Sequence, residues 1–295
     1  MANYPQFPLY IPSLGRHQYM MTSKALTAMG VTHNIVVEPH EVALYKSAVK
    51  RDKLLTRVIP LDMSYKDSYE YCDDKGTTIS TGSGPARNFI WEHSISEGHE
   101  YHWIMDDNIQ CFRRFNKAKK VKCENPAFWS AMEDFVLRYK NVAMAGPMYS
   151  MFAPANTTAK FKPLRLNTRV FSCNLIRNDI GFRWRGRYNE DVILSADILK
   201  AGWCTILFFP FLQDKSATQT MKGGNTDTVY KHGTLEKSQM IVKVHPDISE
   251  LAIRYGRYHH KTDFSGFKNQ KLIKRDDYVP KNGINEYGMV NKKIK

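Results

Sequence analysis

Two kinds of hydrophobic spacing alternate along the chain. Short runs of β-branched and aromatic residues predict strands at Phe7–Pro12, Asn34–Glu38, Arg57–Pro60, Tyr101–Met105, Asn141–Ala145, Arg169–Leu175, Trp203–Phe211 and Met240–Val244. Helical spacing with Gly or Pro near the ends predicts helices at Lys24–Met29, Val42–Lys53, Pro85–Ile95, Pro126–Tyr139, Val192–Ala201 and Ile248–Gly256. Strands and helices that alternate in this order are typical of an α/β fold with a parallel sheet.

The predicted strand Tyr101–Met105 is followed directly by three oxygen-bearing side chains, Asp106, Asp107 and Asn108. In open α/β sheets, ligands bind beyond the carboxyl ends of the strands, so ligands for a metal-bound phosphate are expected here. Asp and Asn are also favoured in turns and at helix caps, which leaves a polar turn as the alternative.

Three positions in the N-terminal half have side chains suited to a nucleotide. Arg16 lies in a tight turn after the first strand. Glu38 ends the second strand, where a carboxylate can accept hydrogen bonds from a ribose or a base. Arg87 lies in the glycine-rich run Thr81–Asn88, which opens a helix and offers free backbone N–H groups to a diphosphate. The run matches neither a Walker loop nor Gly-x-Gly-x-x-Gly.

The C-terminal half contains two further blocks of candidate residues. In Phe182–Asp191, three arginines alternate with aromatic residues and glycine before Glu190 and Asp191 open a helix. Carboxylates at that position complement the helix dipole, and a rigidly held carboxylate also suits a general base. In the second block, Lys222 stands beside Gly223, where the backbone can approach a ligand closely.

The formal net charge of +14 makes polyanions the expected partners. Half of this charge falls in Arg254–Lys295, which has eleven Lys or Arg residues against four Asp or Glu. Basic side chains interleaved with aromatic side chains can contact the phosphates and the bases of a nucleic acid. The candidate nucleic-acid contacts are Arg183, Arg185, Arg187, Arg257, His259 and His260. A solvated basic face that aids solubility is the alternative.

Cysteine usage and apolar runs indicate the compartment. The five cysteines include no Cys-x-x-Cys pair, which argues against a disulfide framework and a zinc site. The longest apolar run, Cys204–Leu212, is too short to cross a bilayer, and no secretory leader is visible. We expect a cytoplasmic protein with no membrane association and no obligate protein partner.

These residues together indicate group transfer from a nucleotide. A metal at Asp106–Asn108 would neutralise a leaving diphosphate that basic side chains such as Arg16 and Lys222 also hold. A separate carboxylate at Asp191 would deprotonate the attacking hydroxyl. This division of roles is typical of an inverting GT-A glycosyltransferase.

Several blocks of the sequence carry a more specific resemblance. They are Ile11-Pro12-Ser13 with Gly15-Arg16, Ala86-Arg87-Asn88, Trp103–Ile109, Tyr188–Asp191, Leu194-Ser195 with Leu199, Gly202-Trp203-Cys204, Thr220–Thr226, and Arg257 with His259-His260. These blocks resemble the TET/JBP-associated glycosyltransferases, which are found chiefly in bacteriophages. The resemblance covers roughly Phe7 to Phe267.

The resemblance implies a GT-A fold, with a Rossmann-like, mixed and mostly parallel sheet flanked by helices and a basic C-terminal extension. We expect a core at residues 1–245, divided into a nucleotide-sugar half at about 1–110 and an acceptor half at about 111–245. Residues 246–295 would form a helical or extended segment packed on the core or extending it. The implied reaction is metal-dependent, inverting transfer from a UDP-sugar to a 5-hydroxymethylpyrimidine in DNA, foremost 5-hydroxymethylcytosine.

Carried over residue by residue, the resemblance makes Asp106, Asp107 and Asn108 the metal and nucleotide motif. It makes Asp191, with Glu190 beside it, the base. The metal would be Mn²⁺ or Mg²⁺, and Asn108 departs from the general Asp-x-Asp pattern because an amide oxygen adds no negative charge.

A histidine from the C-terminal side would complete the metal shell. His245 and His232 are the two candidates, although a lone histidine is more often structural.

Three alternatives stay open at this point. Clustered acids beside basic patches also serve a metal-dependent nuclease or nucleotidyltransferase acting on DNA. A GT-A glycosyltransferase with a protein, glycan or small-molecule acceptor is the second. A non-catalytic DNA-binding protein is the third, and in that protein Asp191→Asn should have no effect.

Overall fold

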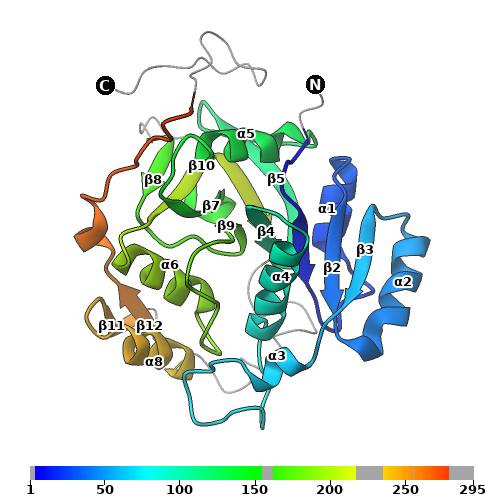
Figure 1. Ribbon diagram of the computed structural model, residues 1–295, viewed down its shortest axis with the longest axis horizontal. Coiled ribbons are helices and arrows are strands. Elements are labelled where there is room, and N and C mark those ends of the chain that lie inside the picture. Colours follow the sequence, from blue (N-terminus) through cyan, green and yellow to red (C-terminus); the bar gives the residue numbers. More distant parts are fainter. Residues whose placement is uncertain (1–3, 155–161, 217–234, 255, 279–295) are drawn as a thin grey trace.

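A computed structural model describes residues 4–154, 162–216, 235–254 and 256–278 of the chain (Figure 1). The main strands within these residues are β1 (Leu9–Pro12), β2 (His33–Val37), β3 (Thr56–Pro60), β4 (Tyr101–Met105), β5 (Ile109–Asn116), β6 (Lys119–Lys122), β7 (Val142–Tyr149), β8 (Leu164–Leu166), β9 (Cys173–Arg177) and β10 (Cys204–Lys215). They form one sheet in the order β3-β2-β1-β4-β9-β7-β10-β5-β6, and β8 also pairs with β10.

Strand direction divides this sheet into two parts. From β3 to β4 all neighbours are parallel, as the strand–helix–strand order predicts. Beyond β4, β9 is antiparallel to both of its neighbours, β7 and β10 are parallel, and β5, β6 and β8 add antiparallel pairs. The mixed sheet flanked by helices confirms the predicted α/β class and is consistent with a GT-A glycosyltransferase domain.

Helices cover both faces of the sheet. The helices of the described residues are α1 (Met21–Ala28), η1 (Pro39–Glu41), α2 (Val42–Arg51), α3 (Ser64–Asp67), α4 (Gly84–Ser96), α5 (Ala127–Val136), η2 (Ser150–Phe152), α6 (Glu190–Lys200), α8 (Leu235–Val244) and η3 (Ser265–Phe267). On β1, Leu9 and Ile11 join a hydrophobic cluster with α1, α2 and α5, whereas Tyr10 joins the cluster that contains α4 and α6. Because successive strand side chains face opposite sides, these two clusters lie on opposite faces of the sheet.

Two predictions near the C-terminus are wrong. Met240–Val244, predicted as a strand, is the last part of helix α8, because Met240 packs with Ile193 of α6 in a separate apolar cluster. Ile248–Gly256, predicted as a helix, instead contains β11 (Ser249–Arg254), which pairs with β12 (Arg257–Thr262) around a left-handed Gly256 (φ 69°). The β5–β6 hairpin was not predicted at all, because its strands are rich in Lys and Arg.

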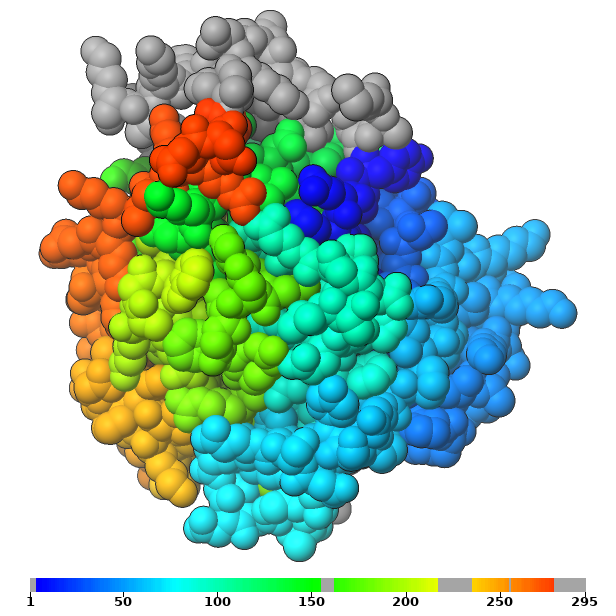
Figure 2. Space-filling view, in the orientation of Figure 1, coloured from blue at the N-terminus to red at the C-terminus, as the bar shows by residue number. Residues whose placement is uncertain are grey.

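The described part of the C-terminal segment returns across the core after β12. The Lys140 N–H donates to the Ile273 carbonyl (2.9 Å), and the Asn141 side chain donates to the Lys271 carbonyl (2.9 Å). In Figure 2 this segment, in orange, and the β1–β3 region, in blue, lie on opposite sides of α4 and α6. The division at residue 245 stays a prediction.

None of the helices in the described ranges combines the length and the apolar character needed to span a membrane.

Candidate active site

A cavity of about 680 Å³ lies beyond the carboxyl ends of β1, β2 and β4, which is the usual ligand position in an open α/β sheet. Its walls include the β1–α1 turn, the N-terminal ends of α4 and α6, and residues of the β11–β12 hairpin. The predicted site residues that line it are Arg16, Glu38, Arg87, Asp106, Asp107, Asn108, Glu190, Asp191, His259 and His260. The fold thus brings most of the predicted residues together from across the sequence.

The β1–α1 turn fixes one wall of the cavity. Gly15 adopts a left-handed conformation (φ 67°), and its N–H donates to both carboxylate oxygens of Glu41 (2.9 and 3.0 Å). The next residue, Arg16, pairs with Asp107, which also accepts a hydrogen bond from Ser13 Oγ (2.7 Å). Burial raises the pKa of Asp107, and the Arg16 charge opposes that shift. The guanidinium is therefore held at the cavity wall.

Arg87 joins the end of β4 to the start of α6. Its Nη2 lies 2.8 Å from Asp106 Oδ1, its Nη1 3.3 Å from Asp191 Oδ1 and its Nε 3.8 Å from Glu190 Oε1. The side chain is only 1% exposed, and the guanidinium lies over the Trp184 ring at 4.6 Å. Because removing it would leave three carboxylates close together, Arg87 holds this acidic cluster together.

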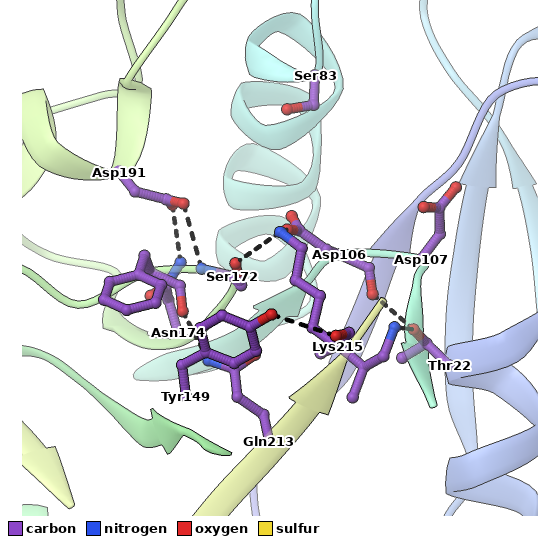
Figure 3. Close-up of polar contacts among 12 residues, drawn as sticks. Thr22, Ser83, Asp106, Asp107, Tyr149, Ser172, Asn174, Asp191, Gln213 and Lys215 are labelled. Atoms are coloured by element: carbon purple, nitrogen blue, oxygen red, sulfur yellow. Dashed lines mark hydrogen bonds and ion pairs between the residues drawn. The ribbon is translucent and has the colours of Figure 1, made fainter. Parts of the chain in front are cut away.

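Lys215, at the end of β10, is a second cation in this cluster. Its Nζ lies 2.5 Å from Asp106 Oδ2 and 3.0 Å from Ser172 Oγ (Figure 3). Burial acts to raise the pKa of Asp106, but Lys215 and Arg87 outweigh it and lower that pKa to about 2. The Asp106 charge in turn raises the pKa of Lys215 against the effect of burial. Both groups are therefore ionised at neutral pH.

Asp191 lies in the first turn of α6. Its Oδ2 accepts the Ser172 N–H and its Oδ1 accepts the Asn174 amide, both at 3.1 Å (Figure 3). Ser172 (φ 66°) and Asn189 (φ 57°), the residue before the helix, are both left-handed, and such strained backbone clusters at functional sites. Burial raises the pKa of Asp191 to about 6, helped by nearby Glu190 and opposed by Arg87. A carboxylate with this pKa can both accept and release a proton near neutral pH.

The side chains expected to bind a metal do not form a preformed set. Asp106 contacts Arg87 and Lys215, and Asp107 contacts Arg16 and Ser13. The Asn108 Oδ1 is buried and has no hydrogen-bond partner among the described residues. Across the described ranges, no three His, Cys, Asp or Glu side chains are grouped so that they could hold a metal ion. The contacts among the described residues give no support to the expected Mn²⁺ or Mg²⁺ site, and the cations that they show are the protein's own side chains.

Residues 7–224 match the model of the family described as TET-Associated Glycosyltransferase. The chain belongs to this family. It is a glycosyltransferase of a family associated with modified DNA bases. No curated protein matches the sequence. The matched residues of this TET-associated glycosyltransferase extend from before β1 to beyond β10, whereas the β11–β12 hairpin lies outside them.

Three predicted ligands of the glycosyltransferase lie outside the described residues, and a fourth lies away from the cavity. Lys222 and Gly223 lie outside the described residues, as does His232. His245 directly follows α8 and contacts the C-terminal half of α6, away from Asp191: its Nε2 is 3.4 Å from Asp197 Oδ1, and Lys200 Nζ is 3.0 Å from its Nδ1. It does not line the cavity, so the structure gives it no part in a metal shell there.

Three of the four predicted DNA-contact arginines have protein partners. Arg187 is fully buried, pairs with Asp73 (2.7 Å) and donates to the Ser80 and Gly76 carbonyls (both 2.6 Å). These contacts hold the segment before α4 in place, which corrects the prediction that Arg187 contacts DNA. Arg185 pairs with Asp197 (2.8 Å) and Arg183 with Glu92 (2.7 Å), and both are partly exposed.

Sequence reasoning missed other residues of the TET-associated glycosyltransferase site, namely Arg169, Ser172, Asn174, Lys215 and Lys237. All except Asn174 line the cavity. One signal for Lys215 was present: the run Gln213-Asp214-Lys215 ends an apolar strand in polar residues, as Asp106-Asp107-Asn108 does. The others depend on how distant strands align, and no local pattern reveals that.

Proposed function

We propose that this glycosyltransferase moves a sugar from a UDP-sugar to the hydroxyl of a 5-hydroxymethylpyrimidine in DNA. The observation that carries the proposal is the position of Asp191. A buried carboxylate with its pKa raised to about 6 shares one cavity with cations suited to a diphosphate. A proton acceptor beside an anion site is what glycosyl transfer by direct displacement requires.

The donor would occupy the half of the cavity near β1, β2 and β3. Pro12, Val37 and Leu61 give this half an apolar wall suited to a base. Glu38 lies beside them, 2.5 Å from Lys66 Nζ, and offers carboxylate oxygens to ribose hydroxyls. The diphosphate would then lie near Arg16 and Lys215, so the sugar would point toward Asp191.

The reaction is a single displacement. The acceptor oxygen bonds to the anomeric carbon as the bond from that carbon to the diphosphate oxygen breaks, and the nucleoside diphosphate leaves with the electron pair. Asp191 takes the proton of the acceptor hydroxyl. Attack opposite the leaving group inverts the anomeric configuration. Arg16 and Lys215, already in place, stabilise the charge that develops on the diphosphate.

The charge distribution supports DNA as the acceptor. Arg254, His259 and His260 of the β11–β12 hairpin line the cavity, and Arg257 is exposed on the same hairpin. Burial beside Lys237 and Arg169 lowers the pKa of His260 to about 4, so His260 acts as a neutral hydrogen-bonding group. A hydroxymethyl group on a pyrimidine lies at the major-groove edge, and a flipped base would bring it into the cavity.

The proposal is tested by mass spectrometry of nucleosides. DNA containing 5-hydroxymethylcytosine or 5-hydroxymethyluracil is incubated with the protein and a panel of nucleotide sugars, and then digested. We expect a sugar-modified nucleoside together with released UDP, and far less of both products with Asp191→Asn. Nicked DNA without sugar transfer would instead support a nuclease, and sugar found only on non-DNA acceptors would refute the DNA substrate.

A further inference from the structure

Three aromatic side chains cluster on a wall of the cavity, and the reaction above uses none of them. The ring centroids of Tyr149 and Phe152 are 5.4 Å apart, and Phe171 lies 6.4 Å from Tyr149 and 6.2 Å from Phe152. All three rings line the cavity, yet Phe152 is 52% exposed. Exposed rings grouped beside a polar site are typical of a ligand surface.

The position of the cluster relative to Asp191 is fixed by hydrogen bonds. Phe171 directly precedes Ser172, whose N–H donates to Asp191. The Phe171 carbonyl accepts a hydrogen bond from the buried Gln213 side chain (2.8 Å). Tyr149 Oη donates to the Lys215 carbonyl (3.3 Å), as Figure 3 shows. Hydrogen bonds to β10 therefore hold Tyr149 and Phe171 in place, and Phe171 is next to the serine that contacts the candidate base Asp191.

We propose that Tyr149, Phe152 and Phe171 form an aromatic cradle that stacks the flipped pyrimidine ring of the acceptor. This inference rests on the proposed function and identifies the part of the site that receives the acceptor base. Every nucleobase has a π face, and flipped bases are commonly held by stacking against aromatic side chains. Arg169 lines the cavity with its guanidinium 5.9 Å from the Phe171 ring, where its charge suits the adjoining phosphate.

Phe152 offers the sharpest test because its exposed ring contributes little to the core. Phe152→Ala should raise the KM for hydroxymethylated DNA, and for the free hydroxymethylated nucleoside, by about tenfold or more. The KM for the UDP-sugar should not change. Phe152→Trp, which keeps a ring, should stay close to wild type. The matched control is Met151→Ala, since Met151 is 66% exposed but does not line the cavity.

Each other outcome overturns the cradle in a recognisable way. An unchanged KM for both acceptors with Phe152→Ala, while the wild type glycosylates DNA, removes the cradle but leaves the proposed function standing. A raised KM for the UDP-sugar alone assigns the rings to the donor sugar and also overturns the inference. If the wild type forms no modified nucleoside with any donor, the proposed function fails and the cradle fails with it.

Discussion

The backbone N–H of Ser172 donates to Asp191 Oδ2 at 3.1 Å, in a left-handed conformation. The carbonyl of the same serine accepts the Asp106 N–H (2.8 Å), and its Oγ lies 3.0 Å from Lys215 Nζ. One residue therefore links the candidate base to the acidic end of β4 and to a cation at the end of β10. The distance between the proton acceptor and the anion site is thus set before substrates bind, which favours catalysis by preorganised groups.

Asp191→Asn should abolish most of the activity without unfolding the site. The amide oxygen can still accept a hydrogen bond from Ser172, but the side chain no longer takes a proton. We expect the transfer rate to fall by about 10²–10⁴-fold, the usual contribution of a general base. Single-turnover transfer and calorimetric UDP binding measure the two properties separately. Wild-type turnover in this variant would show that Asp191 is not the base.

Glu190→Gln is the matched control for that variant. Glu190 Oε1 accepts a hydrogen bond from Ser83 Oγ (3.0 Å) and lies 3.8 Å from Arg87 Nε, so its first role is to position its neighbours. We expect this variant to keep far more activity than Asp191→Asn. The opposite ranking would move the role of the base from Asp191 to Glu190.

The pH dependence of transfer should reflect Asp191. Burial raises its pKa from 3.8 to about 6, so the carboxylate is protonated below that pH and cannot accept the acceptor proton. We expect kcat/KM for the DNA acceptor to rise with pH through about 6 and then level off. Rates at saturating UDP-sugar from pH 4.5 to 8.5 provide the measurement, with circular dichroism to confirm folding at each pH. A flat profile across pH 6 would contradict the assignment.

Lys215 should neutralise part of the diphosphate charge, a role that the sequence analysis gave to a metal. Lys215→Met removes a charge-assisted contact, so UDP affinity should fall by about ten- to a hundredfold, while Lys215→Arg should retain most of it. Because the cations are built into the site, wild-type transfer should persist in EDTA. If EDTA stops transfer and Mn²⁺ restores it, the metal expected from the Asp106–Asn108 motif is required after all.

The sequence predicted Asp106 and Asp191 because their signals are local. Asp106 follows a short apolar strand, and Asp191 stands at a helix start, so periodicity and capping preferences were enough to find both. The same rules placed the parallel strands around β1 correctly. They failed at β11, where the exposed residues of a hairpin carry no apolar stripe that distinguishes a strand from a helix.

Ser172 and Lys215 could not be recognised in this way. They meet because the segment before β9 lies beside the end of β4, and because β10 continues as far as Lys215. Such strand alignment depends on contacts between residues far apart in the sequence, which hydrophobic spacing does not encode. Arg187 shows the reverse error: its sequence neighbours suggest a nucleic-acid surface, whereas its partners Asp73, Gly76 and Ser80 come from a distant segment.

Arg187 and Arg257 should therefore respond differently to alanine. Arg187→Ala leaves Asp73 without its buried partner, so it should destabilise the fold by about 3–5 kcal/mol, seen as a lower Tm. DNA affinity per folded molecule should stay the same.

Arg257 is exposed, so Arg257→Ala should leave Tm unchanged but weaken DNA binding and reduce the salt-dependence slope by about one. Thermal melts and DNA titrations at two salt concentrations measure both effects. An Arg187→Ala protein with wild-type Tm and a flattened salt slope would restore Arg187 to the DNA-binding surface, because a purely structural arginine cannot change the number of phosphates neutralised.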